Sequence, residues 1–442
     1  MRTEFTIYDD PALHLIDCPA SSKIVPSATH EKTGSKWSGL VIGLAALIMF
    51  AVLTFGGTDR WAIATFEVGS GLLFLCWAWP RLTLGQMRLS GNPLYLPMIA
   101  FGLIIVAQVV LRLSAYVHAT RFELWQCIAF AFLFLVASHF DVTGAYSLYK
   151  ILSGFGFAVA MFGLIQHFTY EDKIYWYWPG LPTSFGPYVD HNHYAGLMEM
   201  IAPIPLAMAL TEGAKRHERL FWMIASVLMA ATIFVCGSRG GMIAFGAEMV
   251  LLAALLAIRR NRQTVWVVVA TSLVIGLFAL WLDSGMVLDR VSTLREPLSN
   301  DGVTSRLLIA KDLPSMLFRR PITGWGLGVF PIVYPQYRTF RTNLLVNEAH
   351  NDYLQALVET GILGFTCAVW FIVNLYRAGL RNLRDHSQAA NLRTLGPLVG
   401  CTGILIHSFS EFNMHIPANA ALFFVLSGIA SRRDRNPSQM SK

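Results

Sequence analysis

The chain has 442 residues, of which 55% are hydrophobic and only 14% are charged. This balance excludes a soluble globular protein, because no soluble core of this length needs so much apolar surface, and it favours an integral membrane protein built from spans of about 20 residues. The formal net charge of +7 does not indicate nucleic-acid binding, because the basic residues lie in loops between apolar runs.

Hydropathy predicts an all-α integral membrane protein with about twelve transmembrane helices. We expect a cytoplasmic N-terminal tail (1–37), nine spans in 38–282, an outer loop with short helices and the catalytic elements in 283–350, three more spans in 351–430, and a cytoplasmic C-terminal tail (431–442). The twelve apolar segments are 38–54, 61–79, 93–111, 122–139, 146–168, 194–210, 220–235, 241–258, 264–282, 356–376, 394–409 and 419–430.

The basic residues predict the orientation of these spans. Five basic clusters lie on one side of the membrane if the N-terminus is cytoplasmic, as the positive-inside rule requires: Arg81/Arg88, Lys215/Arg216/Arg219, Arg259/Arg260/Arg262, Arg377/Arg381/Arg384/Arg393 and Arg432/Arg433/Arg435. The opposite, outer face then receives chemistry-bearing residues from distant segments, namely Asn192, His193, Arg239, Arg306, His350, His407 and Glu411. We therefore expect an extracytoplasmic site.

Glu67, Glu199 and Glu248 lie inside predicted spans. An acid in a span is costly and is usually either part of a proton pathway or a neutral, hydrogen-bonded group. The sequence leaves both interpretations open.

Asp190-His191-Asn192-His193 precedes the sixth apolar segment. Two histidines at i and i+2 are poorly placed for one ligand face of a helix, and no further ligand set stands out. The six cysteines show no disulfide or zinc spacing. Hydrogen bonding to a sugar, or a helix cap, is therefore favoured over metal binding.

The turn Cys236–Gly241 joins two spans and carries Arg239 between glycines. An arginine close to helix ends suits a phosphate oxygen, although a snorkelling arginine at the membrane interface is equally compatible. Cys236 could act as the nucleophile of a membrane peptidase, but its place at the end of an apolar run favours a buried thiol.

Asp301–Leu308 predicts the start of a helix with Thr304 or Ser305 as the cap, and Pro314 is expected to break or kink it. Arg306 in the first turn would oppose the helix dipole, which indicates a partner for it, either a bound anion or a structural carboxylate. The glycine-rich stretch Pro321–Phe330 predicts a tight turn at the membrane surface, with Trp325 at the interface.

His350-Asn351-Asp352-Tyr353 opens the tenth apolar segment, with Asn351 or Asp352 as a candidate N-cap. Asp352, Gln355 and Glu359 follow at i, i+3 and i+7, so a helix places them on one face. A polar stripe at the mouth of an apolar helix is costly unless it binds something, which favours a functional site over a simple cap.

Taken in order, "DHNHYAGLMEM", "CGSRGGM", "TSRLLIAKDLPSMLFRRPITGWGLGVF" and "NEAHNDYLQALVETGILG" resemble the O-antigen ligase/polymerase superfamily of bacterial inner-membrane glycosyltransferases. The resemblance covers the second half of the chain. It implies a GT-C-like, metal-independent enzyme without a cofactor, which moves a glycan from undecaprenyl diphosphate to a sugar hydroxyl of lipid A–core on the periplasmic side, with inversion at the anomeric carbon. By the same resemblance, His350 is the catalytic base and Arg239 and Arg306 bind the donor diphosphate. The supporting or acceptor-side residues are Asn192, His193, Asn351, Asp352, Tyr353 and Gln355.

Two alternatives stay open from the sequence. An O-antigen or exopolysaccharide polymerase would use a second lipid-linked glycan as the acceptor. A twelve-helix transporter is the alternative from another class, although the sequence shows no half-to-half repeat and no paired broken helices. The expected partners are the lipid-linked donor, a glycan acceptor and membrane lipids, and no nucleic acid.

Overall fold

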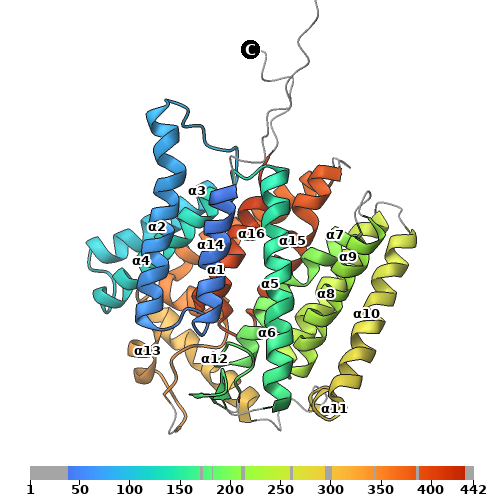
Figure 1. Cartoon of the computed structure of the whole chain (residues 1–442). Coiled ribbons are helices and arrows are strands. Elements are labelled where there is room, and N and C mark those ends of the chain that lie inside the picture. The colour runs from blue at the N-terminus through green and yellow to red at the C-terminus, as the bar shows by residue number, and fades with distance from the viewer. Residues whose placement is uncertain are drawn as a thin grey trace, which may run out of the picture. The chain divides into compact units, whose positions relative to one another are not determined.

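The computed structural model describes residues 38–169, 173–181, 183–210, 215–258, 262–293, 301–342, 345–384 and 388–433. The predicted N-terminal tail, Arg259 and Arg260, and residues 434–442 of the predicted C-terminal tail lie outside this range. Each of the twelve apolar segments coincides with helical structure (Figure 1), so the prediction of an all-α protein with these helices is confirmed.

The first five segments form α1 (Ser38–Leu53), α2 (Arg60–Thr83), α3 (Tyr95–Val110), α4 (Val117–Ala137) and α5 (Val142–Thr169). The sixth segment is split into α6 (His191–Ile201) and α7 (Pro203–Ala209), because Pro203 and Pro205 interrupt the backbone ladder. The remaining six form α8 (Arg216–Val235), α9 (Arg239–Ile258), α10 (Arg262–Leu282), α14 (Asp352–Arg384), α15 (Gln388–His407) and α16 (Pro417–Ala430).

Seven helices within the described residues are long and apolar enough to cross a membrane, namely α2, α4, α5, α8, α9, α10 and α14. The apolar helices α1, α3 and α16 are shorter. The fold is thus that of an all-α membrane protein, and a total of twelve spans remains a prediction.

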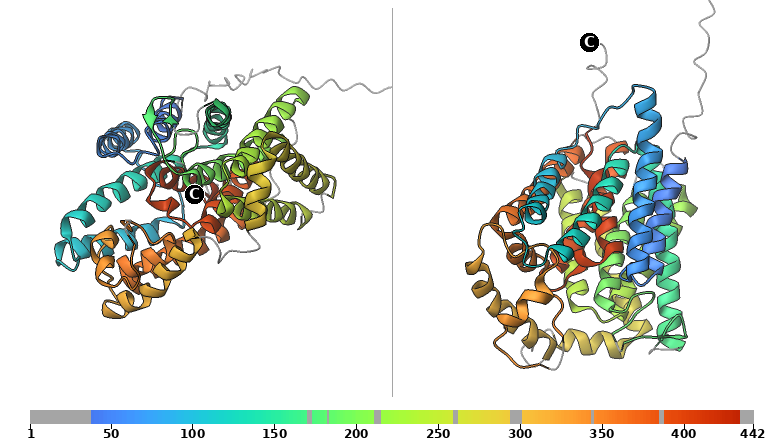
Figure 2. Two further views of the ribbon diagram at one scale, coloured as in Figure 1. Left: turned by 90° about the horizontal axis from the view of Figure 1, so that it is seen from below. Right: turned by 90° about the vertical axis from the view of Figure 1, so that its left-hand side faces the viewer.

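The predicted outer loop contains short helices: α11 (Ser284–Thr293), α12 (Asp301–Arg319), α13 (Phe330–Val333) and the 3₁₀ helix η3 (Tyr334–Gln336). A small antiparallel hairpin of β1 (Lys173–Ile174) and β2 (Trp178–Pro179) belongs to the earlier loop. Figures 1 and 2 show these elements at the same end of the long helices, the lower end in Figure 1. The 3₁₀ helix η4 (Asn413–His415) joins α15 to α16.

A small apolar core fixes the outer loop to α14. Ile309, Leu313 and Met316 lie at i, i+4 and i+7 of α12 and form one buried stripe. This stripe packs in a cluster with Phe330, Tyr334, Ala349 and Val358. The cluster is separate from the main core between the long helices, so it places α12 and the residues before α14 relative to each other.

Pro314 was expected to break or kink this helix. The break is wrong, because α12 continues to Arg319, and the kink stays a prediction. Leu313 and Met316, on either side of Pro314, are both buried, so tertiary packing offsets the lost backbone hydrogen bond. The helix also begins at Asp301 rather than beyond Thr304 or Ser305, so Arg306 lies in the second turn.

The tenth apolar segment is interrupted at Gly361, whose φ of 65° and ψ of −172° are not helical. The glycine-rich turn docks at this break. Trp325 N donates to Val358 O (3.1 Å) and Gly326 N to Glu359 O (2.8 Å), which satisfies carbonyls freed by the break. The tight turn was predicted, but Trp325 packs on protein, with its indole N–H donating to Met316 O (2.9 Å).

Candidate functional site

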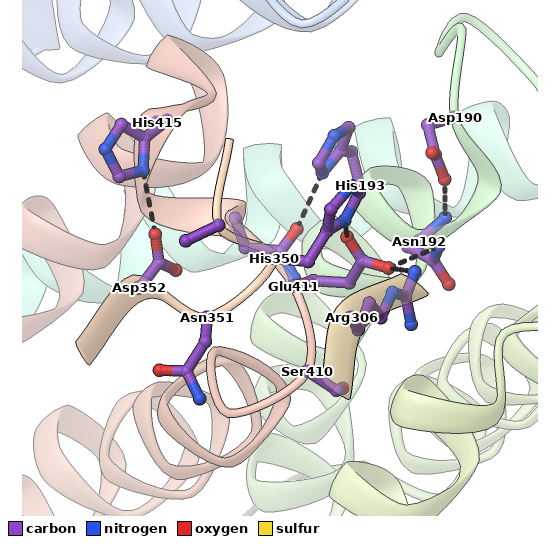
Figure 3. A network of polar contacts seen from close by, with 12 residues as sticks. Asp190, Asn192, His193, Arg306, His350, Asn351, Asp352, Ser410, Glu411 and His415 are labelled. Atoms are coloured by element: carbon purple, nitrogen blue, oxygen red, sulfur yellow. Dashed lines mark hydrogen bonds and ion pairs between the residues drawn. The ribbon is translucent and has the colours of Figure 1, made fainter. Parts of the chain in front are cut away.

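Glu411 lies in the turn between α15 and η4 and forms the centre of a polar network (Figure 3). Its side chain is 1% exposed. Nδ1 of His350 lies 3.0 Å from one carboxylate oxygen, Asn192 Nδ2 donates to the other at 2.8 Å, and Arg306 contacts that same oxygen. Three residues singled out in the sequence thus meet on an acid that the sequence analysis placed at the same outer face without assigning it a specific role.

Burial would raise the pKa of the Glu411 carboxyl, but the hydrogen bond from His350 and the charges of Arg306, His350 and His193 outweigh burial and lower this pKa to about 2. Glu411 is therefore ionised at neutral pH. The structural carboxylate anticipated as one possible partner for Arg306 is this residue, and the guanidinium still has further N–H donors for a second anion.

The backbone around His350 is tied to the end of α15. His350 adopts a left-handed conformation with φ of 51°, which is uncommon for a residue other than glycine. Asn351 is the N-cap of α14, since its Oδ1 accepts from Leu354 N (2.9 Å), and its amide donates to Phe409 O (2.9 Å). Asp352 N donates to Ser408 O (2.9 Å). These contacts hold the strained residue in place.

The imidazole of His350 is oriented as a base requires. Nδ1 faces an ionised carboxylate and so carries the proton, which leaves the lone pair on Nε2. The ring packs edge-on to Phe412, with centroids 5.0 Å apart, and the side chain is 32% exposed. His350 is therefore fixed at one nitrogen and accessible to a ligand.

Three arginines gather on one side of this network. Arg306 contacts Glu411, and Arg239, the first residue of α9, lies within electrostatic range of Arg306 and of Arg290 in α11. The convergence of Arg239 and Arg306 was predicted. Arg290 was not, because no motif surrounds it and only the position of α11 brings it to this side.

A second group of acids lies on the other side, around His415 of η4. His415 Nδ1 lies 2.8 Å from Asp352 Oδ1, and Gln355 Nε2 lies 3.1 Å from His415 Nε2. Gln355 also contacts Glu348. Asp352 and Gln355 thus share one face of α14, as predicted. Burial lowers the pKa of His415, but Glu348, Asp352 and Glu359 raise it well above its usual range.

A cavity of about 330 Å³ adjoins this acidic group. Apolar side chains of α3, α4, α14 and α16 form most of its wall, together with Asp352, Tyr353, Glu359 and His415. Tyr353 donates its hydroxyl to Leu405 O (2.6 Å) and packs on Phe409, with ring centroids 4.4 Å apart. The cavity therefore combines an apolar wall with hydrogen-bonding groups next to the site.

The residues that open α6 make structural contacts. Asp190 caps the helix by accepting from Asn192 N (2.8 Å), and His191 Nδ1 lies 3.1 Å from Thr183 O. His193 Nδ1 lies 3.2 Å from Asn413 Oδ1. In the part of the chain that the structure describes, no three His, Cys, Asp or Glu residues are placed to hold one metal ion.

The position of Cys236 argues against a cysteine nucleophile. Its thiol is buried and donates to Ile233 O (3.2 Å). Burial raises the pKa of this thiol to about 12, so almost no thiolate exists at neutral pH.

Residues 224–369 match a family model described as O-antigen ligase. The matched segment includes Arg239, Arg306 and His350, whereas Asn192 and Glu411 lie on either side of it. A comparison with curated proteins found no match.

Proposed function

Because the match across residues 224–369 makes this chain a member of the O-antigen ligase superfamily, we propose that it transfers a glycan from undecaprenyl diphosphate to a sugar hydroxyl of lipid A–core. The observation that carries the proposal is the contact of His350 with the buried, ionised Glu411, which Arg306 also contacts. The site would face the periplasm, with both termini in the cytoplasm and the chain in the bacterial inner membrane, as the distribution of basic residues favours.

His350 acts as the general base in this proposal. Its Nε2 takes the proton of the acceptor hydroxyl while the hydroxyl oxygen bonds to the anomeric carbon of the donor. The bond between that carbon and the diphosphate oxygen breaks, and the diphosphate leaves with the bonding electrons. Glu411 stabilises the imidazolium that forms, since the carboxylate lies 3.0 Å from Nδ1. Attack from the face opposite the diphosphate inverts the anomeric configuration.

The two sides of the site suit two substrates. Arg239 and Arg306 stabilise the negative charge that grows on the leaving diphosphate, without a metal ion. The acids around His415 would repel a diphosphate but accept hydrogen bonds from sugar hydroxyls. We therefore assign the arginine side to the donor and the side with Asp352, Tyr353 and Gln355 to the acceptor, whose apolar part has access to the adjoining cavity.

Arg239→Ala and Arg306→Ala are expected to weaken donor binding and to slow transfer about 10²–10³-fold, the typical cost of removing one group that stabilises a developing anion. Lysine at either position should rescue only part of the loss, because an ammonium cannot bind a diphosphate bidentately. Titration of purified protein with lipid-linked glycan measures the affinity. Unchanged affinity in both alanine variants would count against the donor assignment.

Treatment with a chelator is expected to leave transfer unchanged, because the proposed chemistry relies on guanidinium groups for charge stabilisation. The measurement is the initial rate with and without the chelator, on protein washed free of divalent ions. Inhibition that Mg²⁺ or Mn²⁺ reverses would contradict the expectation and would direct attention to His191 and His193.

The acceptor test separates the proposed ligase from a polymerase. Purified protein receives lipid-linked glycan together with either lipid A–core or a second lipid-linked glycan. Product on lipid A–core supports the ligase, and an extended lipid-linked glycan supports the polymerase. Uptake of glycan into reconstituted vesicles without any covalent product would instead support a transporter.

A further inference from the structure

We propose that Glu199 and His407, a buried pair behind the site, are positioning residues that hold Glu411 against His350 through Ser238 and Asn192. The inference rests on the proposed function only in that His350 is the base. The pair lies on α6 and α15, and both side chains are 0% exposed.

A continuous series of contacts joins this pair to the site. Glu199 Oε1 lies 2.9 Å from His407 Nδ1, and His407 Nε2 lies 3.4 Å from Ser238 Oγ. Ser238 donates to Asn192 Oδ1 (2.7 Å), and Asn192 Nδ2 donates to Glu411 Oε1 (2.8 Å). Residues of α6 and α15, the residue before α9 and the turn after α15 thus form one series of contacts that ends at His350.

The direction of each hydrogen bond in this series determines how the series orients Glu411. Asn192 stabilises the Glu411 carboxylate only if its NH₂ group, and not its carbonyl, faces Glu411. The hydroxyl of Ser238 enforces that orientation by donating to the amide oxygen. Ser238 can donate there while accepting from His407 if Nε2 of His407 carries a proton. Glu199 contacts Nδ1 of His407 and favours a protonated Nε2 on the same ring. It does so either as a carboxylate beside an imidazolium or as a proton donor to Nδ1.

This series of hydrogen bonds does not conduct protons. The amide of Asn192 donates through nitrogen and accepts through oxygen, and it has no proton to pass between these atoms under ordinary conditions. Ser238 is also tied to α9, since its oxygen accepts from Gly241 N (3.1 Å). The arrangement therefore orients Glu411 and leaves the proton of the acceptor hydroxyl on His350.

Charged groups of the site and of α9 act on this pair. Glu411 and Arg306 act electrostatically on His407, and Glu248 of α9 acts electrostatically on Glu199. Glu248 is 0% exposed, as Glu199 is. Glu248 takes part in none of the contacts between the pair and the site, so it serves as a control for loss of a buried acid.

The test compares Glu199→Leu with Glu199→Gln and uses Glu248→Leu as the control. Leucine removes every hydrogen-bonding group, whereas the glutamine amide still donates to His407 Nδ1 and keeps the proton on Nε2. With a lipid-linked glycan donor and lipid A–core, Glu199→Leu is expected to lower kcat about 10–100-fold with little change in KM, as an imperfectly oriented base does. Glu199→Gln and Glu248→Leu should stay within about threefold of the wild type.

A second measurement is independent of transfer activity. Modification of His350 by diethyl pyrocarbonate, which reacts with the neutral imidazole, is followed by mass spectrometry as a function of pH. In Glu199→Leu a misplaced Glu411 no longer holds Nδ1 of His350 in the same way, so the modification profile of His350 should differ from that of the wild type. The other two variants should keep the wild-type profile.

Each outcome decides between the interpretations. A wild-type profile in Glu199→Leu overturns the positioning role, whatever its activity. Equal losses in Glu199→Leu and Glu199→Gln, or the same shift in Glu248→Leu, also overturn it, because they indicate a general packing role. Thermal unfolding of each variant identifies loss of fold. If the wild type transfers no glycan while the profile shifts as expected, the proposed function fails and the positioning role stands.

Discussion

Replacing His350 with alanine is expected to abolish glycan transfer while the protein still binds the lipid-linked donor. Loss of a positioned general base costs about 10²–10⁴-fold in rate, and the arginine side that we assign to the donor stays in place. The measurement combines single-turnover transfer with donor binding on the same preparation. His118→Ala, which removes an exposed histidine at the start of α4, is the matched control.

The separation of rate from binding is the critical result. Near-normal turnover in His350→Ala would refute the base assignment. A joint loss of donor binding and turnover, with an unchanged unfolding temperature, would move His350 from the acceptor reaction to the binding of the donor.

Replacing Glu411 with glutamine is expected to have an effect of similar size, about 10²–10⁴-fold on kcat, because an amide in place of a carboxylate beside a catalytic histidine removes the charge and permits the wrong tautomer. The glutamine side chain keeps the shape of the carboxylate, but its NH₂ group can donate to Nδ1 of His350. The proton then moves to Nε2, where the acceptor hydroxyl needs a lone pair. Arg306 also loses its buried counter-ion.

Glu411→Asp is the matched variant, since it keeps the charge on a side chain shorter by one methylene. It should recover part of the activity that Glu411→Gln loses, and kcat measured at several pH values compares the two. Equal activity of Glu411→Gln and the wild type would show that the carboxylate does not support the base.

Much of the fold follows from local sequence. Apolar runs of about 20 residues with few charges predicted helices that the structure contains, because a backbone in lipid satisfies its hydrogen bonds within a helix. The two features of the helices that the sequence did not predict have the same cause. The continuation of α12 through Pro314 and the break of α14 at Gly361 both depend on packing between the outer loop and α14, which the pattern of either segment alone does not contain.

The residues of the site likewise fall into two groups, those that local sequence singles out and those that only the fold brings to the site. The sequence singles out His350, Arg306 and Arg239 because each lies in a short motif whose composition is unusual for the mouth of an apolar helix. Glu411, Arg290 and His415 lie in no such motif. Glu411 in particular is a single acid between two apolar segments, and its role comes only from what the fold places against it.

The sequence by itself determined the helices, their expected orientation and the residue types available for chemistry at the outer face. Helix formation and amphipathic patterning act between residues three or four positions apart, so they can be recognised locally. The tertiary structure alone decided which side chains meet. Glu411 contacts residues that are 61, 105 and 219 positions away in the chain, and no local pattern encodes contacts over such separations.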